Sequence, residues 1–270
     1  LLIMLMGLLA PLLTSIDPAE IDPSNRNKVP GYESTVRDDD GNKVQRVAVM
    51  GTDSLGRDIY TRVVWGARVS LTIGIAVAVL SVVFGLFIGL VAGYFRALDG
   101  VVMRIMDGLM AVPAILVAIA LVSLSGASLL TVIVAVTIPE IPRVVRLVRA
   151  IVLSIREEPY VEAAISVGTP TLKVLWRHVL PNTIAPLIVQ ATFIAGSAIL
   201  LEAALSFLGV GIPPEIPTWG NIMAEGRSVF QILPHNILYP AAFLTLTVLA
   251  VNMLGDGLRD TLDPRMAKRV

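Results

Sequence analysis

The most restrictive feature of this sequence is an uncharged apolar run that extends from Ser70 to Tyr94. A helix of this length would measure ~37 Å at 1.5 Å per residue, and ~20 apolar residues already cross ~30 Å of hydrocarbon. The composition agrees, because 55% of the residues are hydrophobic and only 16% are charged, against about 25% charged in soluble domains. The sequence therefore predicts a membrane protein with several spans.

Other apolar segments raise the expected number of spans to six. The block from Leu109 to Pro139 is too long for one crossing, and SLSGAS near Gly126 divides it into a tight helical hairpin. Two more spans are expected at 184–208 and 237–254. The opening LLIMLMGLLAPLL, residues 1–13, is expected to be the outer end of a first span whose inner end is missing. The predicted fold is an all-α membrane helical bundle.

Two prolines, Pro113 and Pro186, fall inside the expected spans. In a membrane bundle the neighbouring helices can satisfy the backbone groups that a proline frees. We therefore expect both spans to continue through their prolines.

Basic residues in short loops predict which side of the membrane is cytoplasmic. They place the loop 143–182 and the tail 259–270 inside, whereas the segment 14–69 and the loop 209–236 face outward. The outer segment contains the acidic run Asp38 to Asp40, and Arg227 is the basic residue of the outer short loops. The basic residues on the predicted inner side are Arg96, Arg104, Arg143, Arg146, Arg149, Arg156, Lys173, Arg177, Arg259, Arg265, Lys268 and Arg269.

One charged stretch between two spans, residues 157–182, has the pattern helix, glycine stop, helix, and is called here the polar interruption. Pro159 suits the first turn of a helix, and Gly168 suits the position after a helix end, where a left-handed backbone is common. Thr169 and Pro170 are expected to be the N-cap and first residue of a second helix, which Pro181 would end.

The second helix of the polar interruption is predicted to be amphipathic. Its apolar residues recur at i, i+3, i+4 and i+7, and its basic residues lie on the other face. Such a helix could rest on lipid headgroups or dock on a cytoplasmic partner, and the residues alone leave both possibilities open. The apolar positions are Leu172, Leu175, Trp176 and Val179, and the basic ones are Lys173 and Arg177.

Five ordered motifs carry a family resemblance. They are EAAISVG followed by VLPN in the polar interruption, GTDSLGRDIYTRVVWGARVSL, RLVRAIVLSIREEPYVEAA, ALSFLGVGIPPEIPTWG and NMLGDGLRDTLDPR. Together with the spans they cover most of the chain from residue 51 to 265. The chain resembles ABC-importer permeases of the dipeptide/oligopeptide/nickel family, in particular the second, C-type permease of dipeptide importers.

The resemblance implies a type I permease fold, with a core at 70–258, and a role for the polar interruption as the coupling segment that docks on an ATPase subunit. It implies further partners: a second homologous permease, two ATPases, an external solute-binding protein and a peptide-like substrate. ATP and magnesium would bind the ATPases, and this chain would need no cofactor. The residues implied in coupling are Glu162, Ala163, Ala164, Gly168, Thr171, Leu172, Leu175, Trp176, Arg177 and Pro181.

Two outer residues are candidates for a substrate path or gate. Glu202 is the carboxylate that lies clearly inside a span, and intramembrane acids are functional candidates by default. It is expected near the outer surface, where it could instead reach headgroups or a partner subunit. Trp219 is expected to be an interfacial aromatic of the outer loop.

The amphipathic elbow before the second span, residues 51–69, is expected to lie at the outer interface. Its functional alternative is a part of the outer gate or a platform for a binding protein. Ile59, Val63 and Gly66 should face the bilayer or the bundle, and Arg57, Asp58 and Arg62 should stay in water.

Several chemistries have no support in the sequence. It has no cysteine and two histidines, His178 and His235, so a metal centre or a catalytic site is not expected. It has no G-x-x-x-x-G-K-[ST] motif for ATP, and nothing points to nucleic acid. The alternatives are a permease for nickel or oligosaccharides and, with less support, a secondary transporter or channel that works alone.

Overall fold

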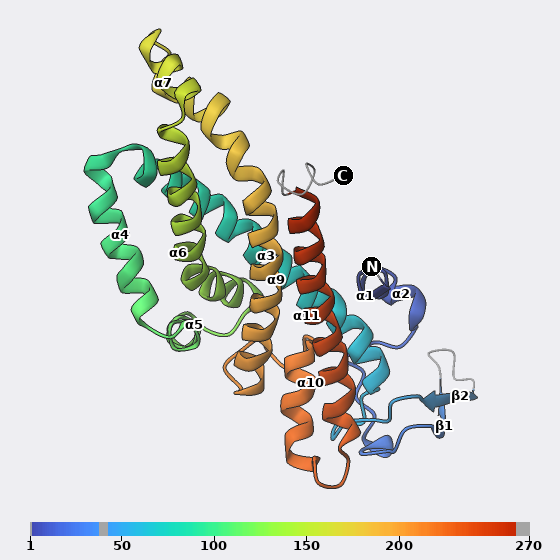
Figure 1. Ribbon diagram of the computed structural model, residues 1–270. Helices are drawn as coiled ribbons and strands as arrows, with labels where there is room; N and C mark the ends of the chain where they lie inside the picture. Colours follow the sequence, from blue (N-terminus) through green and yellow to red (C-terminus); the bar gives the residue numbers. More distant parts are fainter. Residues whose placement is uncertain (1, 38–42, 263–270) are drawn as a thin grey trace. The chain divides into compact units, whose positions relative to one another are not determined.

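The computed structural model describes residues 2–37 and 43–262 (Figure 1). Asp38 to Asp40, and the basic residues Arg265, Lys268 and Arg269 of the predicted inner tail, lie outside the described residues. The chain forms two compact units. Unit 1 comprises Leu1–Ile73, Val122–Val132 and Ile199–Val248, and unit 2 comprises Gly74–Leu121, Ile133–Ala198 and Leu249–Val270.

Helices account for most of the described chain, which agrees with the expected fold class. They are α1 (Leu2–Leu8), α2 (Ala10–Leu13), α3 (Ile59–Tyr94), α4 (Arg96–Ala111), α5 (Ala114–Ser125), α6 (Leu129–Arg156), α7 (Pro159–Ser166), α8 (Thr171–Val174), α9 (Leu180–Phe207), α10 (Trp219–Gly226) and α11 (His235–Leu262). Short 3₁₀ turns lie at Pro23–Asn25 and Arg227–Val229. A small hairpin is an addition to the all-α expectation: β1 (Tyr32–Arg37) pairs antiparallel with β2 (Lys43–Ala48).

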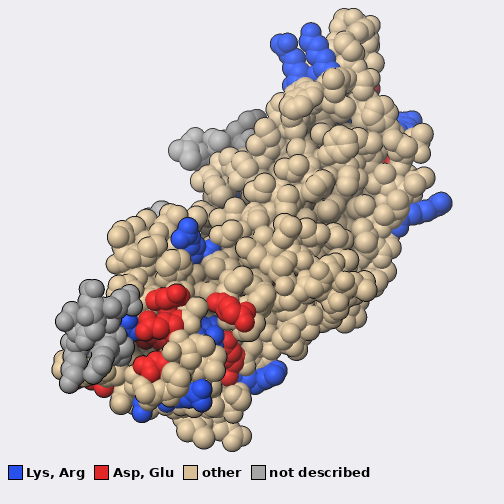
Figure 2. All heavy atoms as spheres, turned by 180° about the vertical axis from the view of Figure 1, so that it is seen from behind, with Lys and Arg blue, Asp and Glu red and all other residues tan. Residues whose placement is uncertain are grey.

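Three helices of the described residues are long and apolar enough to cross a membrane: α3, the continuous helix Thr171–Phe207, and α11. A fourth span would consist of α4 and α5 together, which are bent by 88° at a short break. The count of six spans is not confirmed and stays a prediction. In Figure 2 few charged side chains interrupt the visible face outside one area where acidic residues gather, as a membrane protein requires.

The expected hairpin at 109–139 differs from the observed helices at both ends. Gly126 separates α5 from α6 with a positive φ of 86°, as predicted. However, Pro113 does not continue a span, because the preceding Val112 is extended (φ −97°, ψ 132°) and ends α4. Proline disfavours the helical conformation of the residue before it. At the other end, α6 runs past Pro139 to Arg156.

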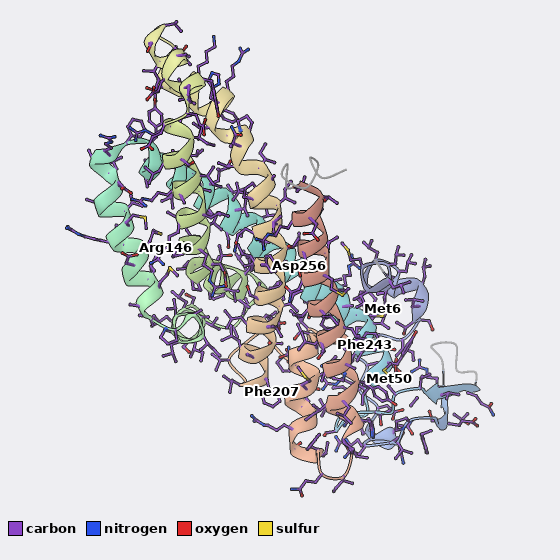
Figure 3. The ribbon with its side chains drawn as sticks, in the orientation of Figure 1. Met6, Met50, Arg146, Phe207, Phe243 and Asp256 are labelled. Carbon is purple, nitrogen blue, oxygen red and sulfur yellow. The ribbon has the colours of Figure 1, made fainter. Side chains whose placement is uncertain are left out.

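The core of unit 1 forms around the start of α3, and the amphipathic elbow continues from residue 59 onward as the first turns of that helix. Figure 3 labels Met6, Met50 and Phe243, three half-buried side chains that pack against this core. The buried core residues come from α3, α9, α10 and α11, and they are Ile59, Val63, Ala67, Ile199, Ala203, Trp219, Ile222 and Leu244.

In unit 2, α3 and α6 pack at unusually close range. A Cβ atom added to Gly89 would lie 2.7 Å from the Cβ of Val148, closer than such atoms approach in proteins. The same clash recurs one turn away on each side, so only glycine allows this contact. The pairs are Gly85 with Val144, Gly89 with Val148, and Gly93 with Val152.

Candidate functional site

The polar interruption begins with α7, which starts as the sequence predicts. Glu158 is the N-cap and Pro159 the first helical residue, where the missing N–H of proline costs little. Val161 is fully buried and anchors the helix. Glu162 and Ala163 are exposed, so one face of α7 is free in the described chain.

Gly168 ends α7 with the predicted left-handed backbone. Its φ is +81°, its N–H donates to the carbonyl of Ile165 (2.9 Å), and the N–H of Thr169 donates to the carbonyl of Ala164 (3.1 Å). These two bonds form a Schellman motif, which satisfies carbonyls at the helix end. A Cβ atom at Gly168 would meet nothing within 4 Å. Glycine is therefore required by the backbone angle and not by a lack of space.

The second helix differs from its prediction at both ends. Pro170 occupies the N-cap, one residue later than expected for the cap, without a side-chain hydrogen bond. Pro181 does not end the helix, because α8 passes through a π-helical turn, Leu175–Val179, directly into α9. In this turn the N–H of Leu180 donates to the carbonyl of Leu175. The wider turn makes room for a proline ring that would otherwise crowd the carbonyl four residues earlier.

The apolar face predicted for this helix is mostly uncovered. Leu172 is 67% exposed and Trp176 is 65% exposed, whereas Leu175 is half-buried. The side chains that the helix buries against unit 2 are those of Val174 and Val179. The free surface consists of the exposed Leu172, Lys173, Trp176 and Arg177. This surface offers two large apolar groups beside two cations.

Glu202 is enclosed by its own chain rather than exposed toward headgroups or a partner subunit. Its side chain is completely buried in unit 1, where Ser206 donates a hydrogen bond of 2.8 Å to its Oε1 atom. Its Oε2 atom has no hydrogen-bond partner among the described residues. The loop packs tightly over this turn of α9, because a Cβ atom at Gly211 would lie 2.2 Å from the Ser206 hydroxyl.

Trp219 is not an interfacial aromatic, which corrects the second outer prediction. It is the first residue of α10 and is fully buried in the core of unit 1. Its indole N–H donates to the backbone carbonyl of Val63 at 3.1 Å. The prediction failed because the outer loop 209–236 folds back on α3 through α10 instead of staying at the surface.

A cluster of four charged residues, of which Glu225 is half-buried and the other three are buried, joins the amphipathic elbow to α10 and is called here the outer charge cluster. Arg57 and Arg62 were expected in water, but they are only 5% and 1% exposed. Arg57 binds Asp53 (2.7 Å), Arg62 binds Asp53 (2.9 Å) and Glu225 (2.7 Å), and Arg57 also pairs with Glu225. Burial raises the pKa of Glu225, and the positive charges of the two arginines oppose this shift.

Comparison with known proteins shows which family the chain belongs to. The sequence model of the family described as "Binding-protein-dependent transport system inner membrane component" matches residues 81–268. The chain belongs to this family. The permease is 49% identical over 265 residues to a Sinorhizobium fredii protein named "Probable peptide ABC transporter permease protein", covering 98% of this chain and 86% of that protein. It is 43% identical to the dipeptide transport system permease DppC of Alkalihalophilus pseudofirmus, covering 97% and 82%.

The solved structures that resemble the permease are transporters of the same architecture. An inward-facing structure of the MetNI methionine ABC transporter aligns with a TM-score of 0.60 and 18% identity, covering 75% of this chain and 96% of that one. An amino acid ABC transporter aligns with a TM-score of 0.59 and 16% identity, covering 75% and 95%. The permease therefore has the type I fold predicted from its sequence, and it is a membrane-embedded subunit of an ABC importer.

The structure gathers the ten residues predicted for coupling into one continuous segment of unit 2, and assigns Glu202 and Trp219 to unit 1. Sequence reasoning missed the outer charge cluster and Glu140, a buried carboxylate inside α6. Glu140 could have been suspected because it ends the uncharged stretch 108–139 in a membrane protein. The pairing of Arg62 with Glu225 could not have been predicted, because the two residues are 163 positions apart in the sequence.

Proposed function

We propose that the permease imports peptide-like substrates across the bacterial or archaeal inner membrane. The support for peptides is that relatives over nearly the whole chain are named as peptide and dipeptide permeases. The proposed assembly contains a second, homologous permease, two cytoplasmic ATPases and an external solute-binding protein. This chain would line half of the translocation path, and its tail and polar interruption would face the cytoplasm.

The observation that carries the coupling proposal is the free surface at Leu172, Lys173, Trp176 and Arg177. Large apolar side chains that stay exposed on a short helix indicate a protein partner or a membrane surface. The adjacent cations, Lys173 and Arg177, lie on an exposed part of the loop that the charge rule assigns to the cytoplasm. An ATPase subunit is the partner that fits this position in an importer.

The proposed mechanism is alternating access driven from the polar interruption. ATP and magnesium bind the ATPases, whose closure moves the helix that begins at Thr171. Because this helix continues without a break into α9, the displacement reaches the membrane directly. Gly168 sets the angle between α7 and this helix, and Glu162, which is exposed, is proposed to pair with a basic residue of the ATPase. Hydrolysis then returns the path to its inward-open state.

The docking proposal is tested by Trp176→Ala, with Ile232→Ala as the matched control. Ile232 is 81% exposed in the loop before α11, outside the polar interruption. The Trp176 variant should lose most of its co-purifying ATPase subunit and its ATP-dependent uptake of dialanine, and the Ile232 variant should keep both. Full ATPase recovery with the Trp176 variant would instead support a helix that rests on lipid.

Glu202 and Trp219 keep a proposed role in the outer gate, now as buried groups. The Glu202–Ser206 contact holds the last turns of α9, and Trp219 ties α10 to α3. The contact of Trp219 joins two elements, α10 and α3, that would have to separate when the path opens outward. Cysteine pairs that lock α10 to α3 should therefore stop transport while leaving ATP binding to the partner subunits unchanged.

A further inference from the structure

Unit 1 contains an open cleft of about 400 Å³, called here the outer cleft. Pockets of about 300–1,000 Å³ are the size that binds ligands. The lining comes from three segments, 19–21, 54–57 and 214–228, none of which belongs to a described helix that is long and apolar enough to cross a membrane. The distribution of basic residues assigns all three segments to the outer side. On this assignment the cleft opens to the outer solution.

The walls of the outer cleft are partly apolar and uncovered. Ile21 is 55% exposed and Leu55 is 38% exposed, and Pro214 is exposed as well. Apolar surface around a hollow is removed from water when a matching group enters, which favours binding. These walls therefore suit a ligand with an aliphatic part.

The outer cleft reaches the outer charge cluster at two of its residues, Arg57 and Glu225. Arg57 pairs with Glu225 and with Asp53. Arg62 pairs with the same two carboxylates, so two arginines offset two acids. The Glu225 side chain nevertheless remains 21% exposed. The cluster is thus balanced in charge, and one of its carboxylates is still accessible.

Glu215 adds a carboxylate that no cation offsets. It is exposed in the loop before α10 and forms no ion pair with any described residue. Arg227, the basic residue of the same outer loop, lies over the ring of Phe207, labelled in Figure 3, with its Cζ atom 5.6 Å from the ring centroid. Arg227 does not line the cleft. With two carboxylates and one arginine, the lining has a net negative charge.

Apolar walls and surplus negative charge together fit a long cationic side chain. Lysine and arginine place their aliphatic stems along apolar surface and keep the charged head in a polar environment. A bare metal cation would leave the apolar walls uncovered. An acidic side chain would meet Glu215 and Glu225, and like charges that face each other across an interface are strongly unfavourable.

We propose that the outer cleft receives a lysine or arginine side chain of the external solute-binding protein. Its charge would lie at Glu215 and Glu225, and its stem would lie against Ile21 and Leu55. The inference rests on the proposed function, in which such a protein delivers the substrate, and it adds the surface that receives this protein. Among the proposed partners, the ATPases are cytoplasmic and the second permease lies in the membrane. The binding protein is therefore the partner that meets a cleft open to the outer solution.

The first test reverses the charge of Glu215 and uses Glu33→Lys as the matched control. Glu33 is an exposed carboxylate of β1, in the same unit but outside the cleft. The complete importer is reconstituted in nanodiscs, and its ATPase activity is measured against the concentration of the solute-binding protein that stimulates it. Glu215→Lys should raise the half-maximal concentration about tenfold or more, because like charges then face each other. Glu33→Lys should leave it unchanged.

Salt separates this effect from damage to the fold. At 1 M ionic strength the Debye length falls to about 3 Å, so the difference between Glu215→Lys and wild type should shrink. A loss of structure would persist in high salt. The proposal is overturned if Glu215→Lys and Glu33→Lys have equal half-maximal concentrations at low salt, or if salt does not reduce the loss.

The second test fills the outer cleft with Ala19→Trp, and Thr35→Trp on β1 is its control. Both positions are exposed, and only residue 19 lines the cleft. The added indole should block entry of the partner's side chain, so the half-maximal concentration should rise severalfold at low and at high salt alike. An unchanged concentration would show that the partner's cation stays outside the cleft, and the inference would be wrong.

The possible failures can be told apart. If no solute-binding protein stimulates the ATPase activity of the wild-type importer, then the proposed function is wrong and the docking inference falls with it. If wild type is stimulated and takes up dialanine, while Glu215→Lys and Ala19→Trp behave like their controls, then the function holds and the outer cleft is not the docking site.

Discussion

Substitutions at Gly168 can isolate the effect of the angle between α7 and the following helix. The residue has a φ of +81°, and an added Cβ atom meets nothing within 4 Å, so the cost of a side chain comes from the backbone alone. For alanine this cost is ~1–2 kcal/mol. Asparagine tolerates positive φ better, and the β-branched valine tolerates it worse. The loss of coupled activity should therefore be smallest for Gly168→Asn, larger for Gly168→Ala and largest for Gly168→Val.

The magnitude follows from the population that keeps the native bend. A penalty of ~1.4 kcal/mol lowers the ratio of native to altered bend about tenfold. We therefore expect Gly168→Ala to reduce substrate-stimulated ATPase activity and dialanine uptake severalfold, and Gly168→Val to abolish most of both. Yield in the membrane should stay unchanged, because no packing contact is lost.

The matched control is Gly108→Ala in α4. This glycine also has open space around it, but its φ is negative. Alanine is favoured over glycine inside a helix by ~0.5–1 kcal/mol, so the control should be as active as wild type and slightly more stable. If Gly168→Val matches the activity of Gly108→Ala, then the bend at Gly168 does not transmit coupling.

Three further changes probe packing, hydrogen bonding and charge, each read from thermal unfolding of the purified permease. Gly89→Ala brings a Cβ atom to 2.7 Å from that of Val148 and should lower the free energy of unfolding by ~1–3 kcal/mol; an unchanged melting temperature would contradict the close contact. Trp219→Phe removes the indole bond to the carbonyl of Val63 and leaves a cavity at a fully buried position, so it should cost more than the ~1 kcal/mol of the hydrogen bond alone; a cost near zero would contradict this packing. Burial raises the pKa of Asp58 above its ordinary value of 3.8, so the charged carboxylate destabilises the fold and Asp58→Asn should raise the melting temperature at pH 7. This gain should vanish as the pH falls through the raised pKa towards 3.8, because the carboxyl is then neutral in both states. A gain that persists at low pH would point to another cause.

Local rules predicted the parts of the structure that depend on neighbours in sequence. Pro159 and Gly168 were placed correctly at the start and end of α7, because helix ends are determined by hydrogen bonds that span five or six residues. The end of α4 is also local, since a residue before proline avoids the helical conformation. This end was missed because neighbouring membrane helices were expected to satisfy the backbone groups that Pro113 frees.

Contacts between distant segments were not predictable from one sequence. Arg62 looked like a surface residue because its acidic partner in α10 is far away in the chain. Trp219 looked like an interfacial aromatic for the same reason, since its binding partner lies on α3. At Pro181 the local rule itself failed, because the π-helical turn accommodates the ring and the helix continues.

The glycines of α3 leave no gap against the valines of α6 over three successive turns. Such an interface has no slack, and close-packed surfaces slide past one another only by passing through clashes. If the polar interruption couples to an ATPase as proposed, a displacement that reaches α6 from α7 should move α3 together with α6 as one rigid unit. Mutations that loosen the contact between α3 and α6, even far from the ATPase, should therefore weaken the transmission of a displacement from α6 to α3.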